Sequence, residues 1–232
     1  MPDLSTAGEV PDDYRPWSPE SGSERSFDLT DESRIQVLVY RSGRLARMGH
    51  NHVIAGIPMG FVALDQGRLR ADIFLSLADL RVDDPALRQA AGTDFDSTPS
   101  DKDIAGTRAN MLSEKLLNAG NFPFIRAQFS AQRVAVAANA GWSVELQMAG
   151  ASHQLRVRPR EIEMVDCELK AAGSFEFSHA DFGLTPYSVL GGALSVADPV
   201  VVQFEIVAVD RQCQGADGSR DESQPSPRSS RP

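Results

Sequence analysis

Cysteine is nearly missing from this sequence. Only Cys167 and Cys213 occur among the 232 residues, and Cys213 falls in a polar stretch close to the end of the chain. We therefore expect no structural disulfide and no requirement for an oxidising compartment. Cys167 is expected to be a small buried apolar residue.

Long apolar runs are missing as well. No run approaches the roughly 18 to 20 residues that a membrane-spanning helix needs. The first 25 residues are acidic and lack the basic and apolar regions of a signal peptide. The sequence therefore predicts a soluble, cytoplasmic protein with no transmembrane segment, and a periplasmic one only if the true start differs.

Positive charge is scarce. Lysine and arginine together number 23 against 32 acidic residues, which gives a net charge of -9. This balance argues against nucleic acid as a partner and against a general affinity for anionic lipid surfaces. The chain also has no Gly-x-Ser-x-Gly elbow, phosphate-binding glycine loop or Cys-x-x-Cys pair. We expect a non-enzymatic protein without a cofactor, although the sequence does not settle whether it is an enzyme.

The sequence does contain enough apolar residues for one domain, and they lie between two polar tails. Residues 1–26 and 211–232 are rich in proline, serine and acids and lack periodicity, so we expect them to be disordered. The chain is 41% hydrophobic, enough for a single core in residues 27–210.

Within this domain, apolar and polar residues alternate with the period of two that is typical of half-buried strands. The clearest strands are expected at residues 34–40, 68–77, 142–148, 168–178 and 200–209. A single longer helix is expected to begin after Ser100 and to end near Gly120, before Pro123, with a shorter helical turn at residues 83–91. About eight or nine strands with one amphipathic helix favour an all-β fold, either a barrel or a sandwich, with the helix over an opening.

Several segments between Arg34 and Val209 together resemble the YceI-like family. They are the opening strand, the glycine-flanked second strand, "LLNAGNFPFIRAQFS" with Leu117, Asn118, Phe122, Pro123, Phe129 and Ser130, the turn around Gly150, and the pair "ADFG" (Asp181, Phe182, Gly183) and "ADPVVVQFEIVA". The resemblance implies a lipocalin-like closed antiparallel β-barrel of about eight strands. It also implies an apolar interior that holds a long isoprenoid or fatty-acyl chain, with no general catalytic machinery.

The segment "GHNH" departs from the better-known members of that family. If residues 45–54 form a strand, then Met48, His50, His52 and Ile54 share one face. Met48 and Ile54 favour this face as the inner one. The same alternation places Phe175, Phe177, His179 and Asp181 together. A further candidate is Tyr187, in a flexible segment suited to a barrel rim.

These observations predict that the partner is a hydrophobic small molecule whose polar end meets histidines at one mouth. The expected ligand-binding residues are Met48, His50, His52, Ile54, Phe129, Phe175, Phe177, His179 and Tyr187. Whether the chain forms a homodimer is left open.

Two other roles for the histidines remain open. A metal such as zinc or iron could be bound by His50, His52 and His179, with Asp181 as a fourth ligand or as a hydrogen-bond partner of a ligand. The plainer alternative is that His50 and His52 are hydrogen-bonded structural residues, and that His179 caps a turn before Phe182.

Overall fold

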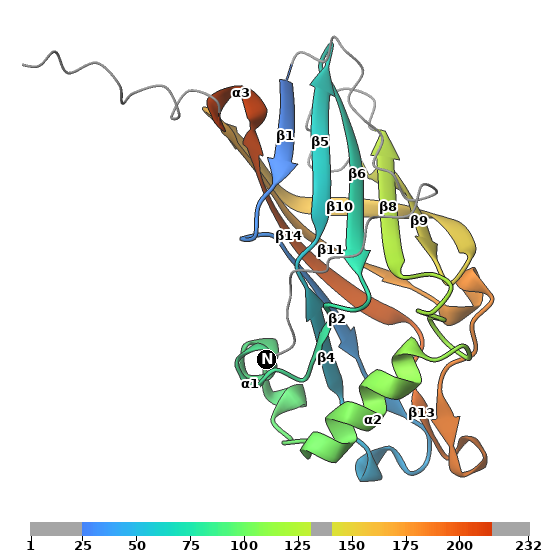
Figure 1. The fold of residues 1–232 in the computed structure, drawn as a ribbon. Helices are drawn as coiled ribbons and strands as arrows, with labels where there is room; N and C mark the ends of the chain where they lie inside the picture. Colours follow the sequence, from blue (N-terminus) through green and yellow to red (C-terminus); the bar gives the residue numbers. More distant parts are fainter. Residues whose placement is uncertain (1–24, 131–140, 215–232) are drawn as a thin grey trace, which may run out of the picture.

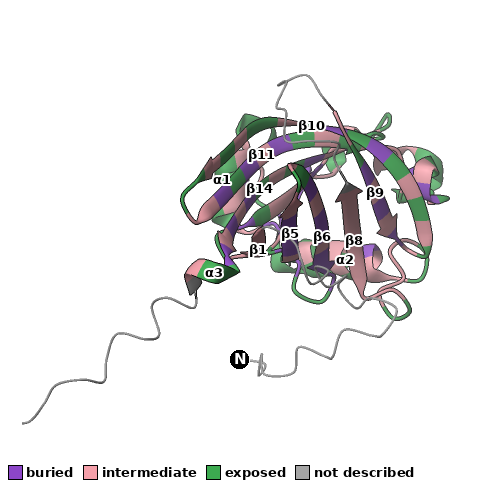
Figure 2. Cartoon of the chain, turned by 90° about the horizontal axis from the view of Figure 1, so that it is seen from above, coloured by how far each residue is buried: buried purple, intermediate pink, exposed green. Residues whose placement is uncertain are grey.

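The computed structural model describes residues 25–130 and 141–214, and antiparallel strands make up most of them (Figure 1). Eight of the strands pair in a continuous ring, which is closed by the pairing of the first strand with the last (Figure 2). The expected closed antiparallel barrel is confirmed. In spatial order the ring consists of β1 (Arg25–Leu29), β5 (Met59–Asp65), β6 (Arg68–Ser76), β8 (Phe124–Ser130), β9 (Trp142–Met148), β10 (Ala151–Val165), β11 (Glu168–Phe177) and β14 (Val200–Asp210).

The barrel strands form because their apolar residues alternate. In β9, Val144, Leu146 and Met148 are buried, whereas the residues that alternate with them are exposed or only partly buried. Successive side chains of a strand point to opposite faces, so this pattern commits one face of β9 to the interior. Burial of that face fixes the register, because a shift of one residue would turn every apolar side chain outward.

At one end of the barrel the sheet divides. The last residues of β14, from Ala208 to Asp210, pair with β1, whereas residues 201–205 pair with β2 (Arg34–Val39). The sheet then continues through β4 (His52–Gly56) to the short β7 (Arg81–Val82). This branch leaves an opening between β7 and β6, since the two strands are not paired.

Helix α2 (Asp101–Leu112) covers this opening, as the sequence predicted (Figure 1). Its apolar residues pack on side chains from β4, β6 and β7; they are Ile104, Met111 and Leu112. The helix begins with a capping box in which Ser100 and Asp103 each bind the other's backbone N–H.

The helix is shorter than predicted, because it ends at Leu112 and not near Gly120. The chain folds back after Ser113, and the N–H groups of Leu117 and Ala119 donate to the carbonyls of Met111 and Leu112. These bonds satisfy carbonyl groups that a longer helix would have satisfied internally. The shorter predicted helix is present as α1 (Pro85–Ala91), with Asp84 as its N-cap.

Three further strands form a small separate sheet at the α2 end of the barrel. They are β3 (Arg41–Ser42), β13 (Leu194–Val196) and β12 (Ser188–Val189), paired in the order β12-β13-β3. Single turns of 3-10 helix lie beside them or in nearby connections: η2 (Ala46–Met48), η3 (Thr93–Phe95), η4 (His179–Phe182) and η5 (Leu190–Gly192). None of the helices in the described ranges is long and apolar enough to cross a membrane.

The expectation that the cysteines stay unpaired is wrong. Cys167, in the turn between β10 and β11, is disulfide-bonded to Cys213 in the short helix α3 (Arg211–Gln214). The polar composition after Asp210 concealed this contact, because the turn that receives Cys213 is 46 residues away in sequence. Most of the two expected tails, residues 1–26 and 211–232, lies outside the described residues, so their disorder stays a prediction.

Candidate functional site

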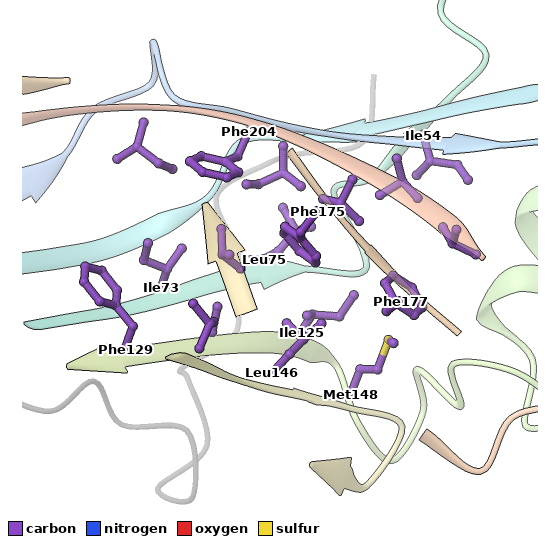
Figure 3. Close-up of a pocket in the computed structure, with 18 of the residues that line it drawn as sticks. Ile54, Ile73, Leu75, Ile125, Phe129, Leu146, Met148, Phe175, Phe177 and Phe204 are labelled. Carbon is purple, nitrogen blue, oxygen red and sulfur yellow. The ribbon is translucent and has the colours of Figure 1, made fainter. Parts of the chain in front are cut away.

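The barrel encloses a cavity of about 240 Å³ that is lined almost entirely by apolar side chains (Figure 3). Every strand of the ring except β1 contributes to its wall, as do β2, β4 and the segment around α2. The ten lining residues that Figure 3 labels are Ile54, Ile73, Leu75, Ile125, Phe129, Leu146, Met148, Phe175, Phe177 and Phe204. Such a wall offers almost no hydrogen-bond partners to water and suits an apolar ligand.

Alternation along β11 and β14 brings three phenylalanines into this wall. Phe175 and Phe177 point inward from β11, and Phe204 points inward from β14 (Figure 3). Gly173 makes room for the last of them, because a Cβ atom at this position would lie 2.7 Å from the Phe204 ring. The register of the pairing between β10 and β11 shifts close to Gly173, between Pro159 and Glu161 of β10.

One wall of the cavity carries an aromatic stack. The rings of Phe129 and Trp142 lie 4.7 Å apart and nearly parallel, at 9°. The stack joins β8 to β9. Stacked rings form a flat, rigid wall for a slender ligand.

His179 is the only ionisable side chain on the cavity wall formed by the described residues. It is 6% exposed, and both its backbone N–H and its Nδ1 atom lie within hydrogen-bond distance of Asp198 Oδ1, at 3.1 and 3.3 Å. Within the described ranges, Nε2 of the ring has no hydrogen-bond partner. If Nδ1 carries the proton toward Asp198, Nε2 is an acceptor, and protonation of the ring makes it a donor.

Five of the nine predicted binding residues lie on the cavity wall: Ile54, Phe129, Phe175, Phe177 and His179. The other four do not, and the cause is the local backbone. Met48 belongs to η2 and is 70% exposed, because β4 begins only at His52. The alternation assumed for residues 45–54 therefore does not apply before that point. Tyr187 lies before β12 and is 44% exposed.

His50 and His52 belong to a polar cluster beside α2, which we call the Asp83 cluster. The carboxylate of Asp83 accepts hydrogen bonds from His52 Nδ1 (2.6 Å) and from the backbone N–H of Val53 (3.0 Å). His52 Nε2 approaches Thr107 of α2 at 3.5 Å, and His50 Nδ1 lies 3.2 Å from the Ser97 hydroxyl.

Arg88 completes the cluster as a buried counterion. Its guanidinium donates to Asp83 and to the backbone carbonyls of Asn51, Phe95 and Ser97. Burial alone would raise the pKa of Asp83, but the hydrogen bonds from His52, Val53 and Arg88 outweigh it and lower the pKa below its ordinary value. The cluster ties β4, α1 and α2 together, which corresponds to the hydrogen-bonded structural role considered for these histidines.

The four residues of the metal alternative are not brought together. His50 and His52 belong to the Asp83 cluster, His179 pairs with Asp198, and Asp181 caps η4 by accepting from the backbone N–H of Ser178 at 2.8 Å. In the described ranges, no group of three or more His, Cys, Asp or Glu side chains could hold a metal ion.

Most of the Asp83 cluster was not predicted from the sequence. The pattern indicated only a short helical turn at residues 83–91, whereas Asp83 is 2% exposed and Asp84 caps α1. The available signal was Asp84 followed by Pro85, which is a typical helix start. Arg88 gave no comparable signal, because burial of an arginine depends on carbonyls that only the tertiary fold positions.

A family model described as a YceI-like domain matches residues 68–208, more than half of the chain. No curated protein sequence matches at a significant level.

Two solved structures are similar in fold. The BcnA protein of Burkholderia cenocepacia superposes with a TM-score of 0.52 at 14% identity, covering 77% of this chain and 97% of that one. A polyisoprenoid binding domain from Saccharophagus degradans, implicated in plant cell wall breakdown, superposes with a TM-score of 0.51 at 11% identity, covering 79% and 97%.

Proposed function

The chain belongs to the YceI-like domain family, and we propose that it binds a long-chain amphipathic lipid, of isoprenoid or fatty-acyl type, inside its barrel. The bound molecule would be sequestered or carried without chemical change. The observation that carries this proposal is the composition of the cavity wall, in which His179 is the one ionisable side chain that the described residues provide.

The energetics of such a cavity favour an apolar chain. An apolar cavity of about 150 Å³ engineered in another protein stays dry and binds benzene, and the present cavity is larger, at about 240 Å³. Each methylene that leaves water contributes roughly 0.8 kcal/mol. A partly enclosed chain of about 15 carbons could therefore reach micromolar affinity after the costs of association.

We further propose that His179 receives the polar end of the ligand. The ring is buried, oriented by Asp198, and has its Nε2 atom without a partner in the described ranges. A hydroxyl can donate to this nitrogen, and an anionic head group can accept from it when the ring is protonated. A hydrocarbon without a polar end would leave this nitrogen unsatisfied.

The fold neighbours are consistent with this function. One of the two is described as a polyisoprenoid binding domain, and isoprenoids are slender, apolar chains of the kind that the cavity wall suits. The identity between the two chains is 11%, so the neighbour supports the class of ligand and not a particular molecule.

The cellular location of the protein stays a prediction, and the disulfide favours a different compartment from the one expected from composition. Disulfides persist mainly in oxidising compartments, and the bond between Cys167 and Cys213 joins two parts of the fold that are far apart in sequence. We therefore propose an extracytoplasmic location in place of the cytoplasmic one expected from composition.

Native mass spectrometry and solvent extraction of the purified protein test the proposed function. We expect a co-purifying isoprenoid or fatty-acyl molecule at up to one per chain, and its partial release by an organic solvent. Repeatedly ligand-free protein that also fails to bind added prenyl alcohols and fatty acids would contradict the proposal.

A further inference from the structure

Exposed apolar side chains gather at the α2 end of the barrel. Seven large hydrophobic residues are exposed among those the structure describes, and four of them lie in two segments, residues 45–48 and 187–190. They are Leu45 (36%), Met48 (70%), Tyr187 (44%) and Leu190 (64%).

These two segments are neighbours in space although 138 residues of sequence lie between them. The backbone N–H of Leu45 donates to the carbonyl of Ala193 at 2.8 Å, and β3 pairs with β13. Gly49, directly after η2, packs so closely on Leu194 that a Cβ atom would lie 3.0 Å from that side chain. In Figure 1 both segments lie at the end of the molecule that carries β13 and α2.

Leu190 has no role in the fold that would require leucine. It adopts a left-handed backbone conformation, with φ at 53°, and its side chain is mostly exposed. A bulky side chain is rare and costly in this conformation, and exposure removes the gain from burial. Met48 is likewise exposed at the end of η2 without packing into the core.

Arginines accompany the apolar residues of the first segment. Arg41 and Arg44, shortly before it, and Arg47 within it are all exposed, and no aspartate or glutamate occurs in residues 34–64 or 182–197. Arg41 bonds to the carbonyl of Gly49, whereas Arg44 and Arg47 have no hydrogen-bond or salt-bridge partner within the described ranges. The first turn of the neighbouring helix α2 carries Asp101 and Asp103 on either side of Lys102.

We propose that this surface, which we call the η2–η5 patch (Arg44, Leu45, Arg47, Met48, Tyr187 and Leu190), docks on an anionic lipid membrane. Exposed apolar side chains beside unpaired arginines are the composition of interfacial membrane-binding segments, in which the apolar groups enter the acyl boundary and the cations meet lipid phosphates. The net charge of -9 opposes general attraction to such a membrane, so binding would be confined to this patch. The inference does not depend on what the cavity holds.

Vesicle flotation tests this docking. The full chain is mixed with vesicles of phosphatidylcholine and phosphatidylglycerol in equal parts, or of phosphatidylcholine alone, at low and at high salt. We expect binding to the anionic vesicles at low salt, weaker binding at high salt, and little binding to the neutral vesicles.

Two patch variants and two matched controls locate the binding. Arg44→Glu/Arg47→Glu and Met48→Ser/Leu190→Ser should each reduce the partition coefficient at least about tenfold. The control Arg156→Glu/Arg158→Glu makes the same change of charge at exposed positions of β10, and Val165→Ser removes an exposed apolar side chain far from the patch. Both controls should bind like the parent protein.

Circular dichroism and thermal unfolding establish that all variants are folded, as expected for exposed positions. Absence of binding to anionic vesicles by the parent protein would overturn the proposal. An equal loss in the patch variants and the controls would also overturn it. So would a dimer, detected by sedimentation, that the Met48→Ser/Leu190→Ser variant dissociates, because the patch would then be covered by a second copy of the chain.

Discussion

At the scale of single residues, we propose that His179 orients the ligand in an otherwise apolar cavity. Its ring is 6% exposed and is held by Asp198. A buried imidazole is costly unless its nitrogens find partners, so a polar ligand group opposite Nε2 would be stabilised. The same ring offers nothing to a plain hydrocarbon.

Replacing this residue should separate recognition of the head group from binding of the chain. We expect His179→Leu to weaken binding of a prenyl alcohol by about two- to tenfold, the equivalent of one hydrogen bond, and to leave binding of an unfunctionalised hydrocarbon of equal length unchanged. Competition against a fluorescent fatty acid measures both affinities. His153→Leu, at a half-exposed site outside the cavity, is the control. Equal losses for the two ligands would show that His179 does not meet the polar end.

Asp83 is the residue on which the polar cluster beside α2 depends. It receives hydrogen bonds from His52, Val53 and Arg88 while almost fully buried. Asp83→Asn leaves the Arg88 charge buried without a counterion, so we expect a loss of about 3–5 kcal/mol in the free energy of unfolding at neutral pH. Asp79→Asn, at an exposed position, should stay within about 0.5 kcal/mol of the parent protein. Urea denaturation measures both.

The pH dependence of this loss follows from the lowered pKa of Asp83. A carboxyl whose pKa is lower in the folded state than in the unfolded state, where it is about 3.9, stabilises the fold above that pH. The stabilisation disappears as the pH falls through the folded-state pKa. The stability difference between the parent protein and Asp83→Asn should therefore be full at neutral pH and shrink below about pH 4. A difference that stays constant across this range would contradict the assignment.

At the scale of elements, the alternation of apolar and polar residues predicted correctly which side chains of a strand face inward. It gave a wrong result for the residues before β4, which do not belong to a strand. The inward faces of β6, β9 and β14 follow directly from the sequence, because one buried face commits a strand to period two. The same rule misplaced Met48, since η2 precedes β4 and breaks the alternation. No local feature of "GHNH" indicates that β4 begins only at His52. The position of this start depends on the contacts of residues 45–49 with Ala193 and Leu194.

The disulfide shows a second limit at this scale. A turn and a short helix that are 46 residues apart meet only in the closed barrel, so composition could not indicate the pair. We expect Cys167→Ser/Cys213→Ser to lower the free energy of unfolding by about 2–4 kcal/mol. Urea denaturation measures the free energy of unfolding of the oxidised protein, the reduced protein and the variant. The reduced protein and the variant should have the same value. Two thiols that react with an alkylating reagent in the native, unreduced protein would contradict the bond.

At the scale of the whole molecule, the barrel is a container whose wall is made by one face of each ring strand except β1, together with β2, β4 and the segment around α2. The sequence and the family resemblance predicted the closed antiparallel architecture and five residues of the wall. They did not predict at which end of the barrel the sheet branches into β2, β4 and β7, or that the Asp83 cluster would lie beside α2 at that end. Those features come from contacts between segments far apart in sequence, which no local pattern encodes.

The central claim is that a lipid chain occupies the space inside this wall. Ala171 and Ala172 are neighbours on β11: Ala171 lines the cavity, and Ala172 faces the opposite side of the sheet. Titration with a fluorescent fatty acid, on variants whose fold is confirmed by circular dichroism, compares Ala171→Trp with Ala172→Trp. Because an indole at position 171 takes up space that the chain needs, the account predicts at least about a tenfold loss of affinity for Ala171→Trp and parental affinity for Ala172→Trp. Parental affinity in a folded Ala171→Trp variant would contradict it.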